Sequence, residues 1–305
     1  MPEQNKTAAP AVKKSKGAVF VARLSSTLVL WALISGALWF NNSYLFYLLV
    51  SSLGLLGYWE FLQMLGHRSK SFNVLRNWSL LVAGGYLLVR FNHFERFGSS
   101  DFGAVESVAI FLAITGAFTV MLPFKIDARR TIEQITQAGF GFVYVVILFT
   151  FLAHLIYLPK DAGAGAPTGG FYLLFVLVVT KFTDMGAYVT GTLIGKHKMI
   201  PHISPGKTWQ GFFGAIVWAV LGGFVVFWIF PSQLQLLTPM HVIILGVILA
   251  LASVIGDLAE SVLKRSLDVK DSGHVLPGIG GALDLIDSLL FTAPIFYFYL
   301  RAVQG

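Results

Sequence analysis

The chain has 305 residues, of which 56% are hydrophobic and only 12% are charged. A typical soluble domain carries about 25% charged residues, so this composition leaves too little polar surface to cover a globule in water. The absence of cysteine excludes disulfides and thiolate metal sites. The net charge of +7 does not indicate nucleic-acid binding, because the basic residues are spread between apolar runs rather than gathered in one domain. The composition therefore predicts a protein embedded in a lipid bilayer.

Several apolar runs are long enough to cross that bilayer, which takes about 20 residues of helix for a hydrocarbon core of about 30 Å. Such runs lie at 20–40, 44–64, 78–97, 104–124, 138–158, 171–192, 211–231, 240–258 and 287–304. The run 78–97 is the least apolar, because it contains Gly84, Gly85 and Arg90. We therefore predict an all-α multi-pass membrane protein with about nine transmembrane helices.

The basic residues between these runs indicate an orientation. Seventeen lysines and arginines lie in the N-terminal segment and in the loops 65–77, 125–137, 193–210 and 259–286, whereas only four lie on the other side. Cytoplasmic loops carry such an excess of positive charge. The pattern predicts a bacterial-type inner (plasma) membrane protein with a cytoplasmic N-terminus, an external C-terminus and an active site that faces the cytoplasm.

The chain divides into three predicted parts. Residues 1–17 are expected to form a disordered basic tail. A cleavable signal peptide is the alternative, but the apolar run that follows exceeds the usual 7–15 residues and lacks a clean A-x-A site. Residues 18–170 are assigned to N-terminal transmembrane helices. Residues 171–305 are assigned to a catalytic transmembrane domain with cytoplasmic loops at 193–210 and 259–286.

Polar residues inside membrane spans cost free energy and usually have a function. Lys181 and Asp184 are three residues apart in one span, so they can pair on one helix face, either as a structural ion pair or as part of a site. Glu60, near the end of the second span, caps a helix, pairs with an arginine or reaches the site.

The loop 193–210 contains a Gly-Lys-Thr sequence at Gly206. A Walker A motif needs another glycine five residues earlier, where this chain has Pro201, so a P-loop is excluded. The lysines of this loop, together with the hydroxyls of Ser204 and Thr208, suit anionic phosphate groups. Ordinary positive charge of a cytoplasmic loop is the alternative interpretation.

The segment from Gly256 to Ser288 has the highest density of polar residues. At 3.6 residues per turn, Asp257, Ser261 and Lys264 share one helix face, and Glu260 lies at the edge of that face. We expect Asp257 near the membrane boundary and the cations further into the cytoplasm.

Asp284 and Asp287 open the last span. Helix capping explains one acid at this position, but not two acids together with Asp257 and a basic cluster opposite. Carboxylates that hold Mg²⁺, beside cations that hold phosphate oxygens, are typical of nucleotide chemistry. His274, in the loop between, is either a phosphate donor or a solvated side chain.

The same segment resembles the C-terminal signature of the phosphatidate cytidylyltransferases, also called CDP-diacylglycerol synthases. That signature runs S-x-x-K-R-x4-K-D-x-G-x2-[LIF]-P-G-H-G-G-x2-D-R-x-D. The matching positions here are Ser261, Lys264, Arg265, Lys270, Asp271, Gly273, Leu276, Pro277, Gly278, Gly280, Gly281, Asp284 and Asp287. The earlier sequences Asp184–Tyr188 and Ile203–Gly211 are also similar to this family, so the specific resemblance covers about residues 180–290.

Two positions depart from the signature. Its histidine is Ile279 here, and the arginine after its first aspartate is Leu285. An active enzyme, a changed lipid acceptor and a weakened or inactive paralogue are all compatible with these changes.

The resemblance implies transfer of CMP from CTP to phosphatidate, which yields CDP-diacylglycerol and pyrophosphate. It implies catalytic roles for Asp257, Lys264, Asp284 and Asp287, with Asp257, Asp284 and Asp287 as ligands of Mg²⁺; a second cation and a homodimer are left open. The expected partners are CTP, phosphatidate and membrane lipids, without nucleic acid. The predicted substrate-binding residues are Asp184, Ser204, Lys207, Thr208, Ser261, Arg265, Lys270, Asp271 and His274.

Two other functions remain as alternatives. A CTP-dependent polyprenol or phytol kinase-like enzyme would phosphorylate an alcohol and release CDP. An ion-coupled transporter would use Lys181, Asp184 and Glu60 as a pathway, but it predicts polar residues spread over many spans and an internal repeat. Here the polar residues gather on two loops, and the sequence shows no repeat.

Overall fold

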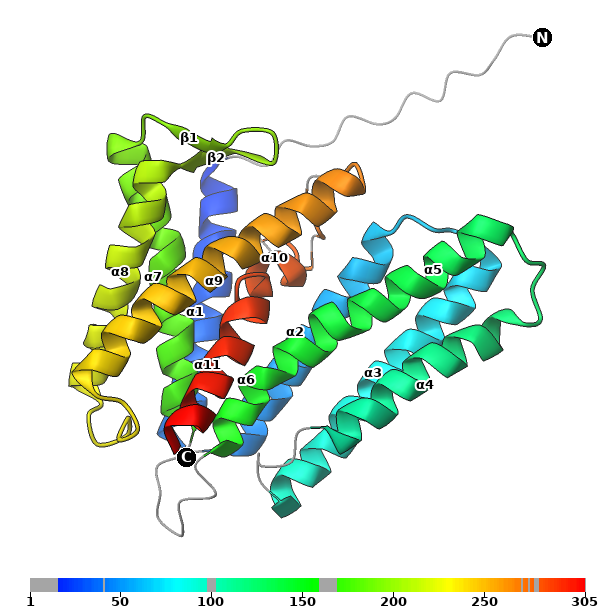
Figure 1. The fold of residues 1–305 in the computed structure, drawn as a ribbon, viewed down its shortest axis with the longest axis horizontal. Helices are drawn as coiled ribbons and strands as arrows, with labels where there is room; N and C mark the ends of the chain where they lie inside the picture. The colour runs from blue at the N-terminus through cyan, green and yellow to red at the C-terminus, as the bar shows by residue number, and fades with distance from the viewer. Residues whose placement is uncertain are drawn as a thin grey trace.

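The computed structural model describes residues 16–40, 42–97, 103–158, 169–269, 271–273, 275–276 and 280–304. In these residues the protein is a bundle of helices with one β-hairpin (Figure 1). The N-terminal helices are α1 (Lys16–Trp39), α2 (Ser43–Met64), α3 (Lys70–Phe97), α4 (Ala104–Met121), α5 (Ala128–Gly141) and α6 (Leu148–Tyr157), with a π-helical turn at Phe142–Ile147 between the last two. The C-terminal elements are α7 (Gly170–Ile194), β1 (Lys198–Ile200), β2 (Ser204–Thr208), α8 (Trp209–Ile229), α9 (Pro239–Ser266), α10 (Ala282–Ile286) and α11 (Leu289–Gln304).

Each predicted span lies on a helix. Seven helical segments among the described residues are long and apolar enough to cross a membrane: 43–64, 104–121, 129–157, 170–194, 209–229, 239–266 and 282–304. The apolar part of α1, Leu28–Trp39, is shorter, and α3 is not among the seven. The all-α membrane fold is therefore confirmed. The number of nine spans, the orientation and the division into domains stay predictions, and the predicted tail lies outside the described residues except for its last two positions.

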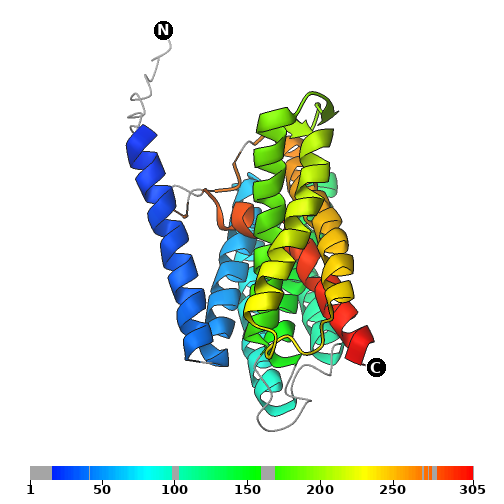
Figure 2. The same ribbon diagram turned by 90° about the vertical axis from the view of Figure 1, so that its left-hand side faces the viewer.

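The helices run alternately between two ends of the bundle. Figure 1 places the start of α1, the turn between α2 and α3, the β-hairpin and the end of α9 at one end, and the end of α11 at the other. Figure 2 shows the same alternation from the side, with α1 at the margin of the bundle. The loops that carry most of the basic residues thus lie at one end, as the charge pattern requires.

Capping residues explain where several helices begin. Asn42, Thr208 and Thr238 each precede a helix, and each side chain accepts a hydrogen bond from the backbone N–H three residues later. Such caps satisfy amide groups that have no partner within the helix. Pro239 follows Thr238 at the first helical position, where its missing N–H costs nothing. These starts are therefore set by local sequence.

The predicted loop 193–210 contains a short hairpin. Strands β1 and β2 pair antiparallel, with Lys198 opposite Thr208 and Ile200 opposite Ser204. At its base, the Gln210 side chain accepts hydrogen bonds from two backbone amides that follow α7. The hairpin is thereby fixed to the junction of α7 and α8 instead of moving freely above the bundle.

Small residues let α7 and α8 approach closely. A Cβ atom added to Gly211 of α8 would lie 2.8 Å from the Ala187 carbonyl oxygen on α7. Membrane helices commonly use small residues in this way, because packing rather than water exclusion drives their association. The close approach brings the start of α8 and the polar part of α7 to the same place.

The N-terminal half contains a buried charge cluster. Arg90 on α3 is fully buried and its Nε lies 3.2 Å from Oε1 of Glu106 on α4. His154 on α6 lies 3.1 Å from the Arg90 guanidinium, and the Tyr86 hydroxyl donates to Glu106 at 3.1 Å. The cluster joins three helices. It explains why an arginine lies within the predicted span 78–97, the least apolar of the predicted spans.

Arg90→Leu should lower the free energy of unfolding by about 3 to 5 kcal/mol, because it removes the guanidinium that pairs with the buried carboxylate of Glu106. The double variant Arg90→Leu with Glu106→Leu should lose less, since no charge is stranded. Denaturant unfolding of the purified protein in detergent would measure both. Arg129→Leu removes an exposed ion pair with Glu133, so it is the control and should leave the free energy of unfolding unchanged. Equal losses in the single and double buried variants would contradict the prediction.

Candidate active site

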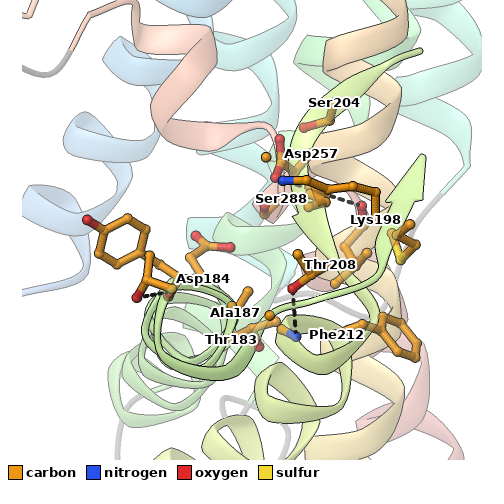
Figure 3. A pocket seen from close by; sticks show the side chains of 18 of the residues that line it. Thr183, Asp184, Ala187, Lys198, Ser204, Thr208, Phe212, Asp257 and Ser288 are labelled. Atoms are coloured by element: carbon orange, nitrogen blue, oxygen red, sulfur yellow. Dashed lines mark hydrogen bonds and ion pairs between the residues drawn. The ribbon is translucent and has the colours of Figure 1, made fainter. Parts of the chain in front are cut away.

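A pocket of about 670 Å³ lies at the hairpin end of the bundle. Its walls come from α7, the hairpin, the start of α8, the second half of α9, α10 and the junction of α10 with α11. Figure 3 shows Asp184, Ser204, Thr208 and Asp257 gathered around it from three of these elements. Segments far apart in the sequence therefore meet in one polar cavity.

The structure brings most of the predicted site residues together. Those that line the pocket are Asp184, Ser204, Lys207, Thr208, Asp257, Asp284 and Asp287. Lys264 is adjacent, because it forms an ion pair with Asp284. Ser261, Arg265 and Asp271 do not line the pocket, and the last two are exposed. Lys270 and His274 lie outside the described residues.

Close packing of α9 against the α10–α11 junction explains how two of the acids meet. A Cβ atom added to Gly256 would lie 2.9 Å from the Asp287 carbonyl oxygen and 3.0 Å from Ser288 Cα. Only glycine fits such a contact without a shift of the backbone. The next residue, Asp257, therefore enters the same pocket as Asp287.

Lys207 links the hairpin to α9. Its Nζ lies 2.7 Å from Asp257 Oδ2 and 3.5 Å from the Val254 carbonyl oxygen. The Lys207 side chain is 21% exposed, so its charge remains within reach of a ligand in the pocket. A phosphate group that bound here would compete with Asp257 for the lysine.

Lys264 lies between two acids. Its Nζ is 2.5 Å from Glu260 Oε2 and 2.5 Å from Asp284 Oδ1. The other oxygen of Asp284 accepts a hydrogen bond from the Gly281 amide at 2.8 Å, which caps α10. Asp284 is therefore both a helix cap and a lysine partner. Glu260 is also buried. It was predicted from the sequence only at the edge of the polar helix face, although its position four residues before Lys264 indicated that the two side chains can pair.

Asp287 differs from the other acids of the pocket. It is buried and its Oδ1 accepts a hydrogen bond from the Ser288 amide at 2.5 Å. Asp257, Asp184 and Lys181 lie close enough for their charges to act on it. No lysine or arginine in the described part of the chain forms an ion pair with Asp287.

Glu60 supports the site from the N-terminal half. It is buried, and its Oε2 accepts a hydrogen bond from the Leu283 amide at 2.9 Å. Of the three roles considered for Glu60, the structure selects the capping of a helix, and that helix is α10. The sequence could not identify it, because 223 residues separate the two partners.

The sequence-based prediction missed several lining residues. Thr183 and Tyr188 on α7, Lys198 on β1 and Ser288 before α11 also line the pocket. Lys198 stood in the predicted phosphate loop without being selected, and Ser288 ends the signature segment. Tyr188 lies four residues after Asp184 on the same helix face, and that spacing was the available signal, whereas Thr183 directly precedes Asp184 and carried no such signal.

The pocket contains side chains of the type that binds a hard divalent cation, but they are not arranged as a complete metal site. Four carboxylates against two lysines line the pocket, and Mg²⁺ prefers oxygen ligands. Within the described residues, however, no three histidine, aspartate or glutamate side chains are grouped closely enough to hold an ion. Asp257 and Asp284 are turned toward lysines instead. The assignment of Mg²⁺ to Asp257, Asp284 and Asp287 therefore stays a prediction.

Lys264→Met should destabilise the protein and lower its activity, because it leaves Glu260 and Asp284 without their shared counter-charge. The expected loss in free energy of unfolding is about 3 kcal/mol for a partly buried charge of this kind. Arg265→Met removes the neighbouring exposed cation and is the matched control. Thermal unfolding of both variants in detergent would test this, and equal shifts would contradict the role of Lys264.

The fold and the pocket define an α-helical membrane protein with one pocket that is lined by both acidic and basic side chains. The cytidylyltransferase family matches the chain over residues 21–303, and the protein belongs to that family. The resemblance of the signature segment to this class of enzyme is thereby confirmed, and with it the assignment as a nucleotidyltransferase.

Three relatives illustrate the similarity. Phosphatidate cytidylyltransferase of Bacillus subtilis (strain 168) is 32% identical over 290 residues, which is 93% of this chain and 97% of that protein. Uncharacterized protein YnbB of Escherichia coli (strain K12) is 31% identical over 71% of this chain and 67% of its own length. Phosphatidate cytidylyltransferase of Staphylococcus epidermidis (strain ATCC 12228 / FDA PCI 1200) is 35% identical over 55% of this chain and 57% of its own length.

Proposed function

We propose that this protein transfers CMP from CTP to phosphatidate, which forms CDP-diacylglycerol and releases pyrophosphate. The observation that carries the proposal is the pocket itself, where four carboxylates and two lysines converge at one end of a membrane bundle. Family membership and relatives named phosphatidate cytidylyltransferase support the choice of substrates. A bacterial membrane is the proposed location.

The hairpin is the proposed binding element for the nucleotide phosphates. Ser204, Lys207 and Thr208 come from β2, and Lys198 lies opposite Thr208 on β1. Their hydroxyl and ammonium groups are donors suited to phosphate oxygens. Two lysines on one small hairpin also offset the repulsion between the two anionic substrates.

The lipid is proposed to reach the pocket from the side of α7 and α8. Tyr188 lines the pocket and is 72% exposed, and apolar side chains such as Leu193 and Phe213 are exposed nearby on the same two helices. Acyl chains would remain against this apolar surface, while the phosphate headgroup enters the polar cavity. The phosphate monoester is already an anion at neutral pH, so attack on the α-phosphorus requires no strong general base.

Mg²⁺ is the proposed metal, with Asp257 and Asp287 as ligands and Asp284 beside them. When bound, the ion would neutralise phosphate charge and stabilise the transition state. Lys207 would hold Asp257 in place before substrate enters, and Lys264 would hold Asp284. The excess of acids over lysines in the pocket supports this proposal, and the positive-inside pattern supports a pocket that opens to the cytoplasm.

Purified protein in detergent micelles, supplied with labelled CTP, phosphatidate and Mg²⁺, should form CDP-diacylglycerol and pyrophosphate in equal amounts. Chelation of Mg²⁺ should stop the reaction. Asp257→Asn should reduce the rate by at least about 100-fold, since a positioned electrostatic contact of this kind contributes about that much.

Asp127→Asn, which changes an exposed acid before α5 and outside the pocket, is the control and should retain the rate of the unchanged protein. Phosphorylation of an alcohol acceptor, with release of CDP from CTP instead of pyrophosphate, would favour the kinase alternative. An unchanged rate in Asp257→Asn would contradict its assignment to the site.

A further inference from the structure

One departure from the family signature changes the charge of the site. The signature has arginine between its last two aspartates, and this chain has Leu285 there, between Asp284 and Asp287. The substitution removes a positive charge from the segment that holds two of the pocket acids. Leu285 instead packs against the hydrophobic core.

Another element places a positive charge at the same point. Lys181 on α7 donates a hydrogen bond from its Nζ to the Leu285 carbonyl oxygen at 3.3 Å. The same Nζ lies 3.6 Å from Asp184 Oδ2. The ammonium group therefore lies beside the backbone of the very residue where the signature has arginine, and it comes from a helix 104 residues earlier in the chain.

Lys181 differs from the other lysines near the pocket in the acids that lie around it. Lys207 is paired with Asp257, and Lys264 with Glu260 and Asp284. Asp287 forms no ion pair with any lysine or arginine among the described residues, but the charge of Lys181 acts on it. Lys181 thus offsets the two pocket acids, Asp184 and Asp287, that the other lysines leave unbalanced.

A lysine inside a membrane span is costly, so its presence calls for a compensating role. Lys181 does not line the pocket itself. Its contacts are an acid that does line the pocket and the backbone between α10 and α11. It can therefore act on the reaction through the residues that it holds.

We propose that Lys181 is a positioning residue, which supplies from α7 the positive charge that the family signature places at position 285. The proposal rests on the function proposed above. It explains how the site tolerates Leu285: a lysine of another helix lies at the backbone of the position where the signature has arginine.

The test compares Lys181→Met in two backgrounds, the natural sequence and Leu285→Arg. In the natural background, Lys181→Met should lower kcat by up to about 100-fold, because a small displacement of reacting groups has that effect, and it should change the KM for CTP much less. In the Leu285→Arg background, the fold-decrease in kcat caused by Lys181→Met should be at least ten times smaller. Lys125→Met, which changes an exposed lysine outside the pocket, is the control and should have no effect.

A second measurement does not depend on activity. Thermal unfolding of each variant is followed while Mg²⁺ is titrated. Loss of the Lys181 charge leaves the acids more negative, so Lys181→Met should lower the half-saturating Mg²⁺ concentration several-fold, and Leu285→Arg should restore it. A lysine that only packs the helices would not shift this concentration.

A double variant that is as impaired or as unstable as Lys181→Met alone would overturn the proposal. So would an equal loss of kcat in the two backgrounds. If the unchanged protein forms no CDP-diacylglycerol, the proposed function fails, while the Mg²⁺ titration still tests the placement of the charge.

Discussion

The candidate site depends on a balance of charge at the hairpin end of the helix bundle. Its acids are partly or fully buried at the ends of membrane-spanning helices, where an uncompensated charge is expensive. Lys207 of β2 forms an ion pair with Asp257, and Lys264 of α9 forms ion pairs with Glu260 and Asp284. Lys181 of α7 lies beside a further acid, Asp184. Along the pocket wall itself acids outnumber lysines, since the lining contains Asp184, Asp257, Asp284 and Asp287 but only Lys198 and Lys207.

The helices serve this balance by bringing polar residues from distant segments to one end of the bundle. Gly256 allows α9 to touch the α10–α11 junction, and Gly211 allows α8 to touch α7. Glu60 on α2 caps α10 and so connects the N-terminal half to the signature segment. The buried cluster around Arg90 has a different task, since it joins α3, α4 and α6 away from the pocket.

Most of the candidate site could be predicted because its residues carry a signal in the sequence. Acids and lysines near apolar spans are rare, so Asp184, Asp257, Asp284 and Asp287 stand out from residue type and position alone. Arg265 and Asp271 carry the same signal, yet they are exposed and do not line the pocket. Charge alone does not reveal which side of a helix or loop faces a cavity.

The sequence by itself determined the all-α membrane fold, the position of each span on a helix and two of the segments that line the pocket. These follow from hydropathy and residue type, which act locally along the chain. Only the tertiary structure decided the partners: Glu60 with Leu283, Lys207 with Asp257 and Lys181 with the backbone of Leu285. These contacts join residues that are 50 to 223 positions apart in the sequence. Helix packing decides which of such distant residues meet, and no local sequence pattern encodes that packing.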